Sequence, residues 1–193
     1  MEKKTRWLDV GNGGNFEKGF YYLDILSSKK PRFFQKDILH LEKADLVEMG
    51  RFDYVRMQHF FEHFTPEEGL IVLANAADLL SPGGIITISV PDLRIFVDSY
   101  LNKRFDNLPK FIWWANKRIP LKSPASFYFS VFAHSMPWEQ HKWCYDYEGL
   151  EYQLQKTGLF VNIREIKVDD ELACVPFTHN RPKEDVCIIA SRK

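Results

Sequence analysis

Cysteine, long apolar runs and excess charge are the three features that this sequence has least of. Its three cysteines, Cys144, Cys174 and Cys187, lie far apart and form no CxxC pair, which indicates a reducing compartment rather than a disulfide framework. No apolar run approaches the ~18 residues of a membrane-spanning helix, and the first residues show no signal-peptide pattern. We therefore expect a cytoplasmic protein.

The chain also carries no net charge. Lysine plus arginine and aspartate plus glutamate number 26 each, so the formal net charge is zero and the pI is near 7.0. A broad phosphate-binding surface needs a basic excess, so nucleic acid is not an expected partner. No group of histidine, aspartate or glutamate shows the spacing of metal ligands, and we expect no metal site. With 193 residues, the chain 1–193 is expected to fold as one domain around one core.

The first 24 residues hold the most informative pattern. An apolar strand at 7–10, a glycine-rich turn at 11–14 and a second apolar strand at 20–23 lead to Asp24. Glycines let the backbone approach a ligand closely, and an acid at the tip of the next strand can accept both hydroxyls of a ribose. Only about ten residues separate the turn from Asp24, against roughly twenty where a full helix intervenes. We therefore expect that helix to be reduced to one turn or absent.

The remainder of the chain alternates between strand and helix signals. The expected later strands cover residues 31–35, 52–57, 85–90, 160–168 and 185–190. The expected helices cover residues 40–49, about 66–80, 93–102 and 146–157, with a short helical turn at 59–63. After the Thr65 cap, helical spacing predicts an inward face made of Leu70, Leu73, Ala74, Ala77 and Leu80. Strands that alternate with helices predict an α/β fold with a mostly parallel sheet covered on both faces.

Residues 8–13, Leu-Asp-Val-Gly-Asn-Gly, look like the glycine loop of class I S-adenosylmethionine-dependent methyltransferases. Residues 52–63 resemble the fourth-strand segment of that family, and residues 80–90, with their Pro-Gly-Gly turn, resemble the fifth. The ending at 89–92 and the segment 141–143 are similar to a compact, type-11-like subgroup with a shortened glycine loop. That subgroup is often met beside sugar-modifying and cell-surface-polysaccharide enzymes.

The resemblance covers about residues 6–104 and 141–191, and it implies a fold and a cofactor. The implied fold has three layers and is Rossmann-like, with a mostly parallel seven-stranded sheet and an antiparallel last strand. The implied cofactor is S-adenosyl-L-methionine. The sequence departs from the family pattern at Asn15, where a third glycine is usual. Asparagine tolerates left-handed dihedrals better than most residues, so the turn is expected to survive.

The resemblance also implies which residues bind the cofactor. They are Asp9, Gly11, Gly13, Asp24, Asp37, Ile38, Met57 and Gln58. Asp9 would orient the loop or the ammonium of the methionine tail, and the two glycines would pass close to the methionyl part. Asp24 would accept the ribose hydroxyls. Simpler interpretations stay open, with Asp9 as the cap of a turn and Asp24 as an ordinary loop acid.

The other four implied residues follow the third and fourth strands. Asp37 and Ile38 would contact adenine, with Asp37 accepting from the exocyclic amine. Met57 and Gln58 would lie under the cofactor and face the acceptor. Asp37 has an alternative interpretation as a helix cap.

Histidines are the candidates for a general base. In methyl transfer the protein chiefly aligns and desolvates the reactants, and an acceptor hydroxyl benefits from a base that titrates near neutral pH. We expect His141 to be the catalytic base, with His59 second and His134 third, although each could be a structural hydrogen-bonding group. Glu62 and His63 are expected to stabilise the loop beneath the pocket.

Residues 105–142 form an aromatic-rich insert outside the regular pattern, and they follow Asp92, which either holds a sugar hydroxyl or caps a helix. Residues 103–122 hold six basic residues against the single acid Asp106. Three interpretations stay open for the insert: a packed lid or homodimer surface, an acceptor-binding lid, and a basic aromatic face that contacts an anionic membrane.

Together these observations predict a methyltransferase. The expected acceptor is a hydroxyl or amine of a small molecule or sugar, such as a precursor of a cell-surface polysaccharide. Two alternatives remain from the residues alone. One is a catalytically silent ligand-binding module of the same fold. The other is a dinucleotide-dependent oxidoreductase, which the missing third glycine and the shortened helix disfavour.

Overall fold

A computed structural model describes residues 5–102, 140–168, 170–172, 174–179 and 181–193, so most of the expected insert at 105–142 lies outside the described residues. The strands are β1 (Trp7–Val10), β2 (Phe20–Asp24), β3 (Phe33–Gln35), β4 (Phe52–Gln58), β5 (Leu80–Pro91), β6 (Phe160–Glu165) and β7 (Asp185–Arg192). The α-helices are α1 (Lys43–Met49), α2 (Pro66–Leu79), α3 (Leu93–Leu101) and α6 (Tyr147–Thr157). Two 3-10 turns are η1 (Ile38–His40) and η2 (Phe61–His63).

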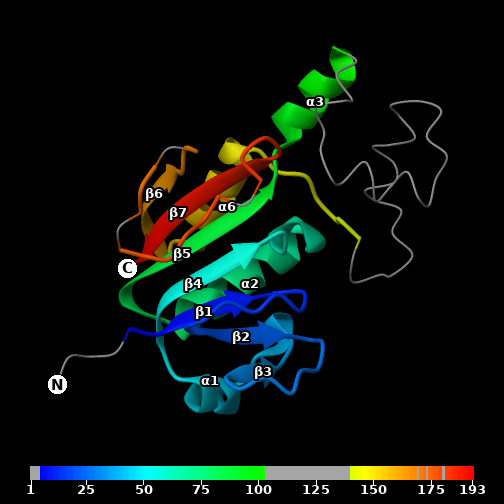
Figure 1. The fold of residues 1–193 in the computed structure, drawn as a ribbon. Coiled ribbons are helices and arrows are strands. Elements are labelled where there is room, and N and C mark those ends of the chain that lie inside the picture. The colour runs from blue at the N-terminus through cyan, green and yellow to red at the C-terminus, as the bar shows by residue number, and fades with distance from the viewer. Residues whose placement is uncertain (1–4, 103–139, 169, 173, 180) are drawn as a thin grey trace.

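The seven strands form one sheet in the order β3-β2-β1-β4-β5-β7-β6 (Figure 1). The pairs among β1 to β5 are parallel. The last strand, β7, runs antiparallel to both of its neighbours, β5 and β6. The predicted α/β fold with a mostly parallel seven-stranded sheet and an antiparallel last strand is therefore confirmed.

Local sequence signals explain most helix boundaries. Thr65 and Glu68 form a capping box at the start of α2, with Pro66 in the first turn. Asp146 caps α6, and Gly158 ends it in the left-handed conformation with φ 69°. Between β1 and β2, residues 11–19 hold no helix, as the shortened spacing predicts.

Two details of the α2–β5 unit differ from the expectation. The buried face of α2 carries Gly69, Val72, Leu73, Ala76 and Ala77, whereas Leu70 and Ala74 are only half-buried. The helix is rotated because Gly69 lies against the ring of Phe61, where an added Cβ would lie 3.0 Å from the nearest ring atom. The strand β5 also begins earlier than expected, at Leu80 instead of Ile85, and its register with β4 shifts between Phe52 and Tyr54.

One face of the sheet, which we call the helix-covered face, packs against α2 and α6, which lie together on one side of the sheet (Figure 1). Its buried strand residues are mostly aliphatic, with two aromatic rings. They are Leu8, Val10, Leu23, Phe52, Val55, Met57, Leu80, Ile86, Ile88, Val90, Phe160, Val186, Ile188 and Ala190.

The opposite face, which we call the loop-covered face, is closed differently. Its buried strand residues are Phe20, Tyr22, Tyr54, Cys187 and Ile189. Leu172, Val175 and Phe177, from the segment between β6 and β7, pack over them, and no helix of the described residues joins these clusters. A helix between β1 and β2 or between β2 and β3 would lie over such a face, but residues 11–19 and 25–32 form none.

The segments before and after residues 103–139 come together beside the carboxyl end of β5. Asp92, directly after β5, forms an isolated parallel bridge with Tyr145. The N–H of Leu93 donates to the carbonyl of Tyr145 at 2.8 Å. None of the helices in the described ranges has the length and apolar character that crossing a bilayer requires.

Candidate functional site

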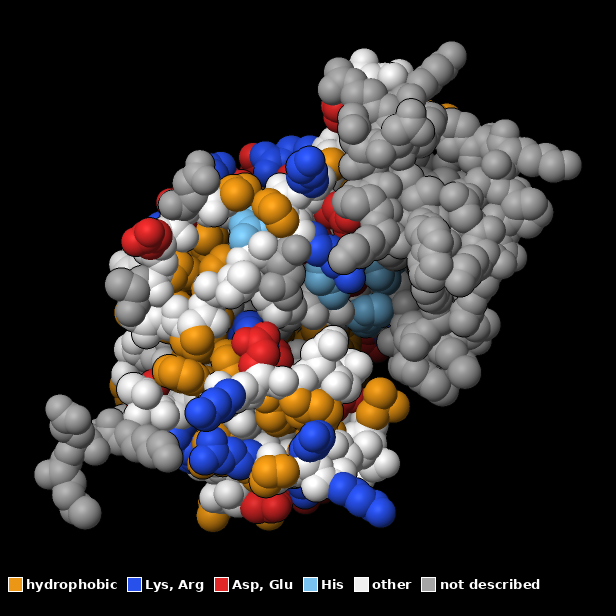
Figure 2. Space-filling view, viewed as in Figure 1, with side chains coloured by type: hydrophobic (Ala, Val, Ile, Leu, Met, Phe, Trp, Pro, Cys, Tyr) orange, Lys and Arg blue, Asp and Glu red, His pale blue; other side chains and the backbone are white. Residues whose placement is uncertain are grey.

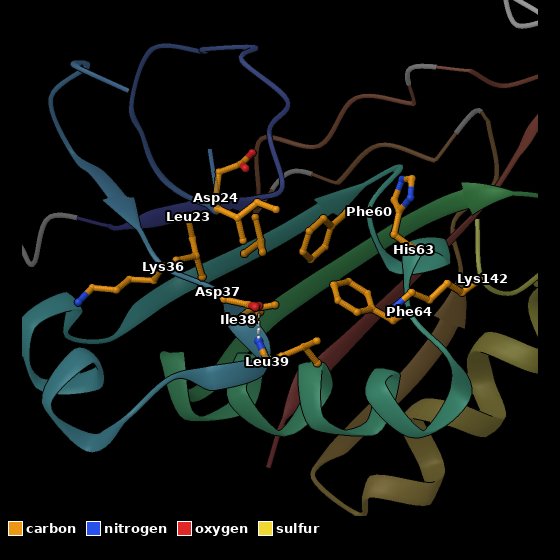
Figure 3. Close-up of a pocket in the computed structure, with 12 residues that line it drawn as sticks. Leu23, Asp24, Lys36, Asp37, Ile38, Leu39, Phe60, His63, Phe64 and Lys142 are labelled. Atoms are coloured by element: carbon orange, nitrogen blue, oxygen red, sulfur yellow. Dashed lines mark hydrogen bonds between the residues drawn. The ribbon is translucent and has the colours of Figure 1, made fainter. Parts of the chain in front are cut away.

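Two cavities lie at the carboxyl ends of the central strands β1 and β4, where the strand order of the sheet reverses. In open α/β sheets this reversal is where ligands bind. The first cavity, of about 340 Å³, is lined on its apolar side by Val10, Leu23, Ile38, Leu39, Phe60 and Phe64, and elsewhere by Asp24, Ile25, Lys36, Asp37, His63 and Lys142 (Figure 3). The second, of about 490 Å³, is lined by Asp9, Gly11, Asn12, Asn15, Phe16, Glu17, Arg56, Gln58, His59 and Arg181.

Asp24 is the acid of the first cavity. It ends β2 and is buried, with 9% of its surface exposed. Its Oδ2 accepts from the N–H of Gly13 at 3.2 Å, and its Oδ1 accepts from the N–H of Leu26 at 2.9 Å. Because an ionised carboxylate has about four lone-pair sites, both oxygens can accept further hydrogen bonds from a ligand. The turn is thus built around the carboxylate that sequence analysis placed at a ribose.

Asp37 and Ile38 form the opposite wall of the first cavity (Figure 3). Asp37 caps η1, because its Oδ1 accepts from the N–H of Leu39 at 2.9 Å. Ile38 is buried, and its carbonyl accepts from the side-chain amide of Asn75 at 2.6 Å. Asp37 therefore caps the 3-10 turn η1, as one of its two sequence interpretations expects. The cap uses Oδ1 and does not involve Oδ2.

The ring of Phe60 separates the two cavities. It lines the first cavity and packs directly on Gly11, which lines the second. Gly11 has φ 69°, and a Cβ added there would lie 1.9 Å from the Phe60 ring. Gly13 and Gly14 also have positive φ, but an added Cβ at either would meet no atom within 4 Å. Among these three turn positions, Gly11 is therefore the one where sterics as well as conformation require glycine.

Buried charges define the second cavity. Arg56 of β4 donates from Nη2 to Oδ2 of Asp9 at 2.7 Å and from Nε to Oδ1 at 3.2 Å, and its Nη2 also lies 2.9 Å from Oε1 of Glu17. Burial alone would lower the pKa of Arg56, but its hydrogen bonds to Asp9 and Glu17 and their charges raise it above its ordinary value. Asp9 is thus held by an ion pair with Arg56, and the sequence around Asp9 does not indicate this partner.

Asn12 offers a polar atom to the second cavity. Its Nδ2 donates to the carbonyl of Asn15 at 2.6 Å. Its Oδ1 is buried and has no hydrogen-bond partner among the described residues. A buried acceptor without a partner is costly, and this one belongs to a residue that lines the second cavity.

Met57 and Gln58 lie on opposite faces at the end of β4. Met57 is fully buried among the aliphatic residues of the helix-covered face and lines neither of the two cavities. Gln58 lines the second cavity, and its Nε2 donates to the carbonyl of Thr178 at 3.2 Å. Strand alternation, which turns Val55 and Met57 toward the helices, explains the difference.

His59 is held between two carboxylates. Its Nε2 lies 2.8 Å from Oδ2 of Asp185, and its Nδ1 lies 3.5 Å from Oε1 of Glu62. Burial lowers its pKa, but the hydrogen bonds to the two carboxylates and their charges outweigh burial and raise the pKa to about 9. The ring is therefore protonated at neutral pH. Its backbone has φ 51°, a left-handed conformation that is uncommon outside glycine.

His63 and His141 come together beside Glu62. Figure 2 shows histidine side chains gathered on the visible face, and Glu62, His63 and His141 each offer a ligand atom within 4.8 Å of the others. The N–H groups of Lys142 and Trp143 donate to the carbonyl of Glu62 at 2.8 and 3.2 Å, which fixes the segment of His141 against η2. The sequence predicts only a supporting role for Glu62 and His63 and does not place His141 beside them.

Two other candidates are resolved differently. Asp92 caps α3, with its Oδ1 accepting from the N–H of Arg94 at 2.9 Å, which is the helix-cap interpretation. His134 and the basic segment 103–122 lie outside the described residues.

Solved structures of other proteins share this fold. Neither a protein-family model nor a curated protein matches this chain. A solved SAM-dependent methyltransferase from Archaeoglobus fulgidus is similar, with a TM-score of 0.55 and 16% identity over 97% of this chain and 86% of that one. The chain has the fold of class I S-adenosylmethionine-dependent methyltransferases. The compact subgroup is not distinguished by this likeness.

Two further solved structures share this methyltransferase fold. An S-adenosylmethionine-dependent methyltransferase from Clostridium acetobutylicum has a TM-score of 0.55 and 12% identity, over 98% of this chain and 84% of that one. The S-adenosylmethionine-dependent methyltransferase SibL has a TM-score of 0.55 and 17% identity, over 98% of this chain. The chain covers 51% of SibL, so it spans about half the length of that protein.

Within this methyltransferase fold, the described structure brings most of the predicted site residues to the same edge of the sheet. The first cavity gathers Asp24, Asp37 and Ile38, and the second gathers Asp9, Gly11, Gln58 and His59. Asn12 and Arg56 are among the cavity residues that the sequence did not indicate, as are Phe60, Glu17 and Arg181. Asn12 lies inside the glycine turn, where an asparagine is read as a turn former, and Arg56 lies in a strand that otherwise reads as apolar.

Proposed function

We propose that this protein is an S-adenosylmethionine-dependent methyltransferase that modifies a hydroxyl or amine of a small molecule. A sugar, such as a precursor of a cell-surface polysaccharide, is the favoured acceptor. The observation that carries the proposal is the buried Asp24, held by the turn N–H of Gly13 at the edge of a cavity of about 340 Å³. The shared fold supports the same conclusion.

The first cavity suits the adenosine half of the cofactor. Ile38, Leu39 and Phe64 provide an apolar slot for a flat base. Asp24, at the strand end, can accept the ribose hydroxyls. Asp37 lies at the same wall with one carboxylate oxygen outside its cap, where it can accept from an exocyclic amine.

The second cavity suits a zwitterionic methionine tail. The buried Oδ1 of Asn12 is an acceptor that lacks a partner among the described residues, as an ammonium group requires. Arg181 lines the same cavity with a side chain that is 45% exposed and can face a carboxylate. The residues present therefore fit both ends of the cofactor, with Phe60 between them.

Bound S-adenosylmethionine supplies an electrophilic methyl group on a sulfonium centre. The acceptor oxygen or nitrogen forms a bond to the methyl carbon as the carbon–sulfur bond breaks, sulfur keeps the electron pair, and the acceptor proton must leave. His59 is already a cation at neutral pH, because its pKa is raised to about 9, so it is a poor proton acceptor. We therefore propose His141 as the group that accepts the proton. His59, which lies between Glu62 and Asp185, has a positioning role.

One observation favours a second candidate, a silent binding module of this fold. The ring of Phe60 covers Gly11, where the methionyl part of a cofactor would pass. A dinucleotide-dependent oxidoreductase is less favoured, because residues 11–19 provide no helix N-terminus for a pyrophosphate.

Calorimetric titration with S-adenosylmethionine, S-adenosylhomocysteine and NAD tests the proposal. We expect the first two to bind and NAD not to bind. Asp24→Ala should weaken S-adenosylmethionine by about 10- to 100-fold, because hydrogen bonds to a charged group contribute roughly 1.5–3 kcal/mol. The control Asp78→Ala, at an exposed acid on α2, should leave the affinity unchanged. Binding of the cofactor with no methylated product from any hydroxyl or amine acceptor would favour the silent module.

A further inference from the structure

Glu62, His63 and His141 form a cluster with the chemistry of a metal site. Their three ligand atoms lie within 4.8 Å of one another, and no other group of this kind occurs in the described residues. Ligands around a tetrahedral zinc ion are about 3.3 Å apart, given zinc–nitrogen bonds of about 2.0 Å. Small rotations of the two imidazoles would close the remaining gap.

The carboxylate of Glu62 is buried beside the cationic ring of His59, which it shares with Asp185. Glu62 is 1% exposed, and neither of its side-chain oxygens has a hydrogen-bond partner among the described residues. The nearest ring nitrogens, Nδ1 of His59 and Nε2 of His141, lie 3.5 and 3.9 Å from Oε1. The shorter contact of His59, at 2.8 Å, goes to Asp185. One imidazolium between two buried carboxyl groups leaves room for a second cation at Glu62, since a buried carboxylate is costly unless it is paired or coordinates a metal.

His63 is oriented as metal-bound histidines are. Its Nδ1 lies 3.1 Å from the carbonyl oxygen of Gln140. Since a carbonyl only accepts, Nδ1 donates this hydrogen bond, and the matching tautomer of the imidazole leaves the lone pair of Nε2 for a ligand bond. A backbone carbonyl on the second ring nitrogen is the usual outer partner of a metal-bound histidine.

The backbone holds the cluster in place before any ion binds. Lys142 and Trp143 donate their N–H groups to the carbonyl of Glu62, and Nζ of Lys142 lies 2.9 Å from Oε2 of Glu68 on α2. The segment that carries His141 is therefore fixed to the turn that carries Glu62 and His63. The rings of His63 and His141 are perpendicular, with centroids 5.0 Å apart.

We propose that Glu62, His63 and His141 bind a divalent first-row transition-metal ion, with zinc as the probe. Two imidazoles and one carboxylate suit zinc, iron, cobalt or nickel, whereas magnesium and calcium prefer oxygen ligands. His63 also lines the first cavity, so the cluster lies beside the proposed cofactor pocket. If the proposed methyl transfer holds, an acceptor hydroxyl bound to the ion beside that pocket would lose its proton more readily, and His141 would then act as a ligand rather than as a base. Metal binding itself does not depend on that function.

The test is direct metal binding by the full chain after treatment with a chelator. We expect one equivalent of Zn²⁺ by calorimetry, a visible absorption band of Co²⁺ with low coordination number, and little response to Mg²⁺. Glu62→Gln, His63→Gln and His141→Gln should each weaken Zn²⁺ by more than the roughly 10- to 100-fold that loss of an outer partner costs. The control His40→Gln removes a histidine whose side chain is 79% exposed, and it should leave binding unchanged.

Several outcomes would overturn the proposal. One is the absence of a zinc-binding equivalent in folded wild-type protein. Another is binding that survives in all three ligand variants but is lost in Cys144→Ser or Cys174→Ser, since these thiols are exposed. Thermal unfolding guards against variants that fail to fold: zinc should raise the melting temperature of wild type and of His40→Gln but not of His141→Gln. S-adenosylmethionine titrations of the same proteins are read separately, so the metal site and the methyltransferase proposal can each fail alone.

Discussion

The two faces of the sheet are closed by different means. On the helix-covered face, aliphatic side chains from five strands pack against α2 and α6. On the loop-covered face, aromatic rings, the Asp9–Arg56 pair and the bond between the Tyr54 and Thr87 hydroxyls lie beneath a segment without helix. Non-directional burial stabilises the first face, while the second depends on paired polar groups that must find specific partners.

The difference bears on the site, because the second cavity opens beside the polar pairs. Asp9 and Arg56 both line it. The shortened glycine turn removes the helix that would cover this face and leaves charged side chains to close it. Stability and ligand binding therefore share polar residues on the loop-covered face, whereas the helix-covered face contributes apolar residues such as Val10 and Leu23 to the first cavity.

The largest expected effect comes from breaking the buried ion pair between Asp9 and Arg56. Arg56→Met leaves Asp9 buried without its partner and should destabilise the protein by about 3–5 kcal/mol. The double variant Asp9→Leu with Arg56→Met should recover most of that loss, because replacing a buried ion pair by apolar groups is often neutral. Urea denaturation measures both. A single variant within about 1 kcal/mol of wild type would show that the pair does not hold this face together.

A matched pair on β7 compares the two faces directly. Ile188 points to the helix-covered face and is fully buried, and Ile189 points to the loop-covered face and is 9% exposed. We expect Ile188→Ala to cost about 4 kcal/mol and Ile189→Ala about 2 kcal/mol, because the loop side can collapse into the space left. Equal losses in denaturant unfolding would mean that both faces are packed with the same rigidity.

The glycine turn gives a smaller effect with a built-in control. Gly11→Ala combines a left-handed backbone with the Phe60 clash and should cost about 2 kcal/mol. Gly14→Ala, at φ 85° and with no atom near an added Cβ, should cost about 1 kcal/mol. Thermal unfolding and cofactor titration measure the pair. If Gly14→Ala were as harmful as Gly11→Ala, the Phe60 contact would not be what requires glycine.

The reactivity of the cysteine thiols measures how well the loop-covered face is closed, and it needs no substitution. Burial raises the pKa of the Cys187 thiol to about 12, so at pH 8 it stays protonated and should resist alkylation. Cys174 is exposed and should react quickly. Mass spectrometry after a timed iodoacetamide pulse distinguishes the two sites, and both should react in denaturant. Rapid modification of native Cys187 would indicate that the covering segment opens readily.

Much of this fold could be predicted from local signals. The Thr65 capping box, Gly158 after α6 and the short distance from the glycine turn to Asp24 each act over a few residues, and each corresponds to the observed structure. The inward face of α2 could not be predicted, since it depends on the contact between Gly69 and the distant ring of Phe61.

The candidate site shows the same limit. Asp24 and Asp37 are reached by the pattern of strand ends, and both line the first cavity. The cationic state of His59 depends on Asp185 and Glu62. The approach of His141 to Glu62 depends on backbone hydrogen bonds across the fold. Spacing along the chain indicates neither the approach of Asp185 to His59 nor the approach of His141 to Glu62.

The bridge between Asp92 and Tyr145 closes the neck of a long excursion of the chain. Because the two stems already touch, the cost of joining them grows only slowly with the number of residues in between. The sheet can therefore keep its register while the sequence between residues 102 and 140 is lengthened, trimmed or exchanged, provided that the segment from His141 to Tyr145 is kept.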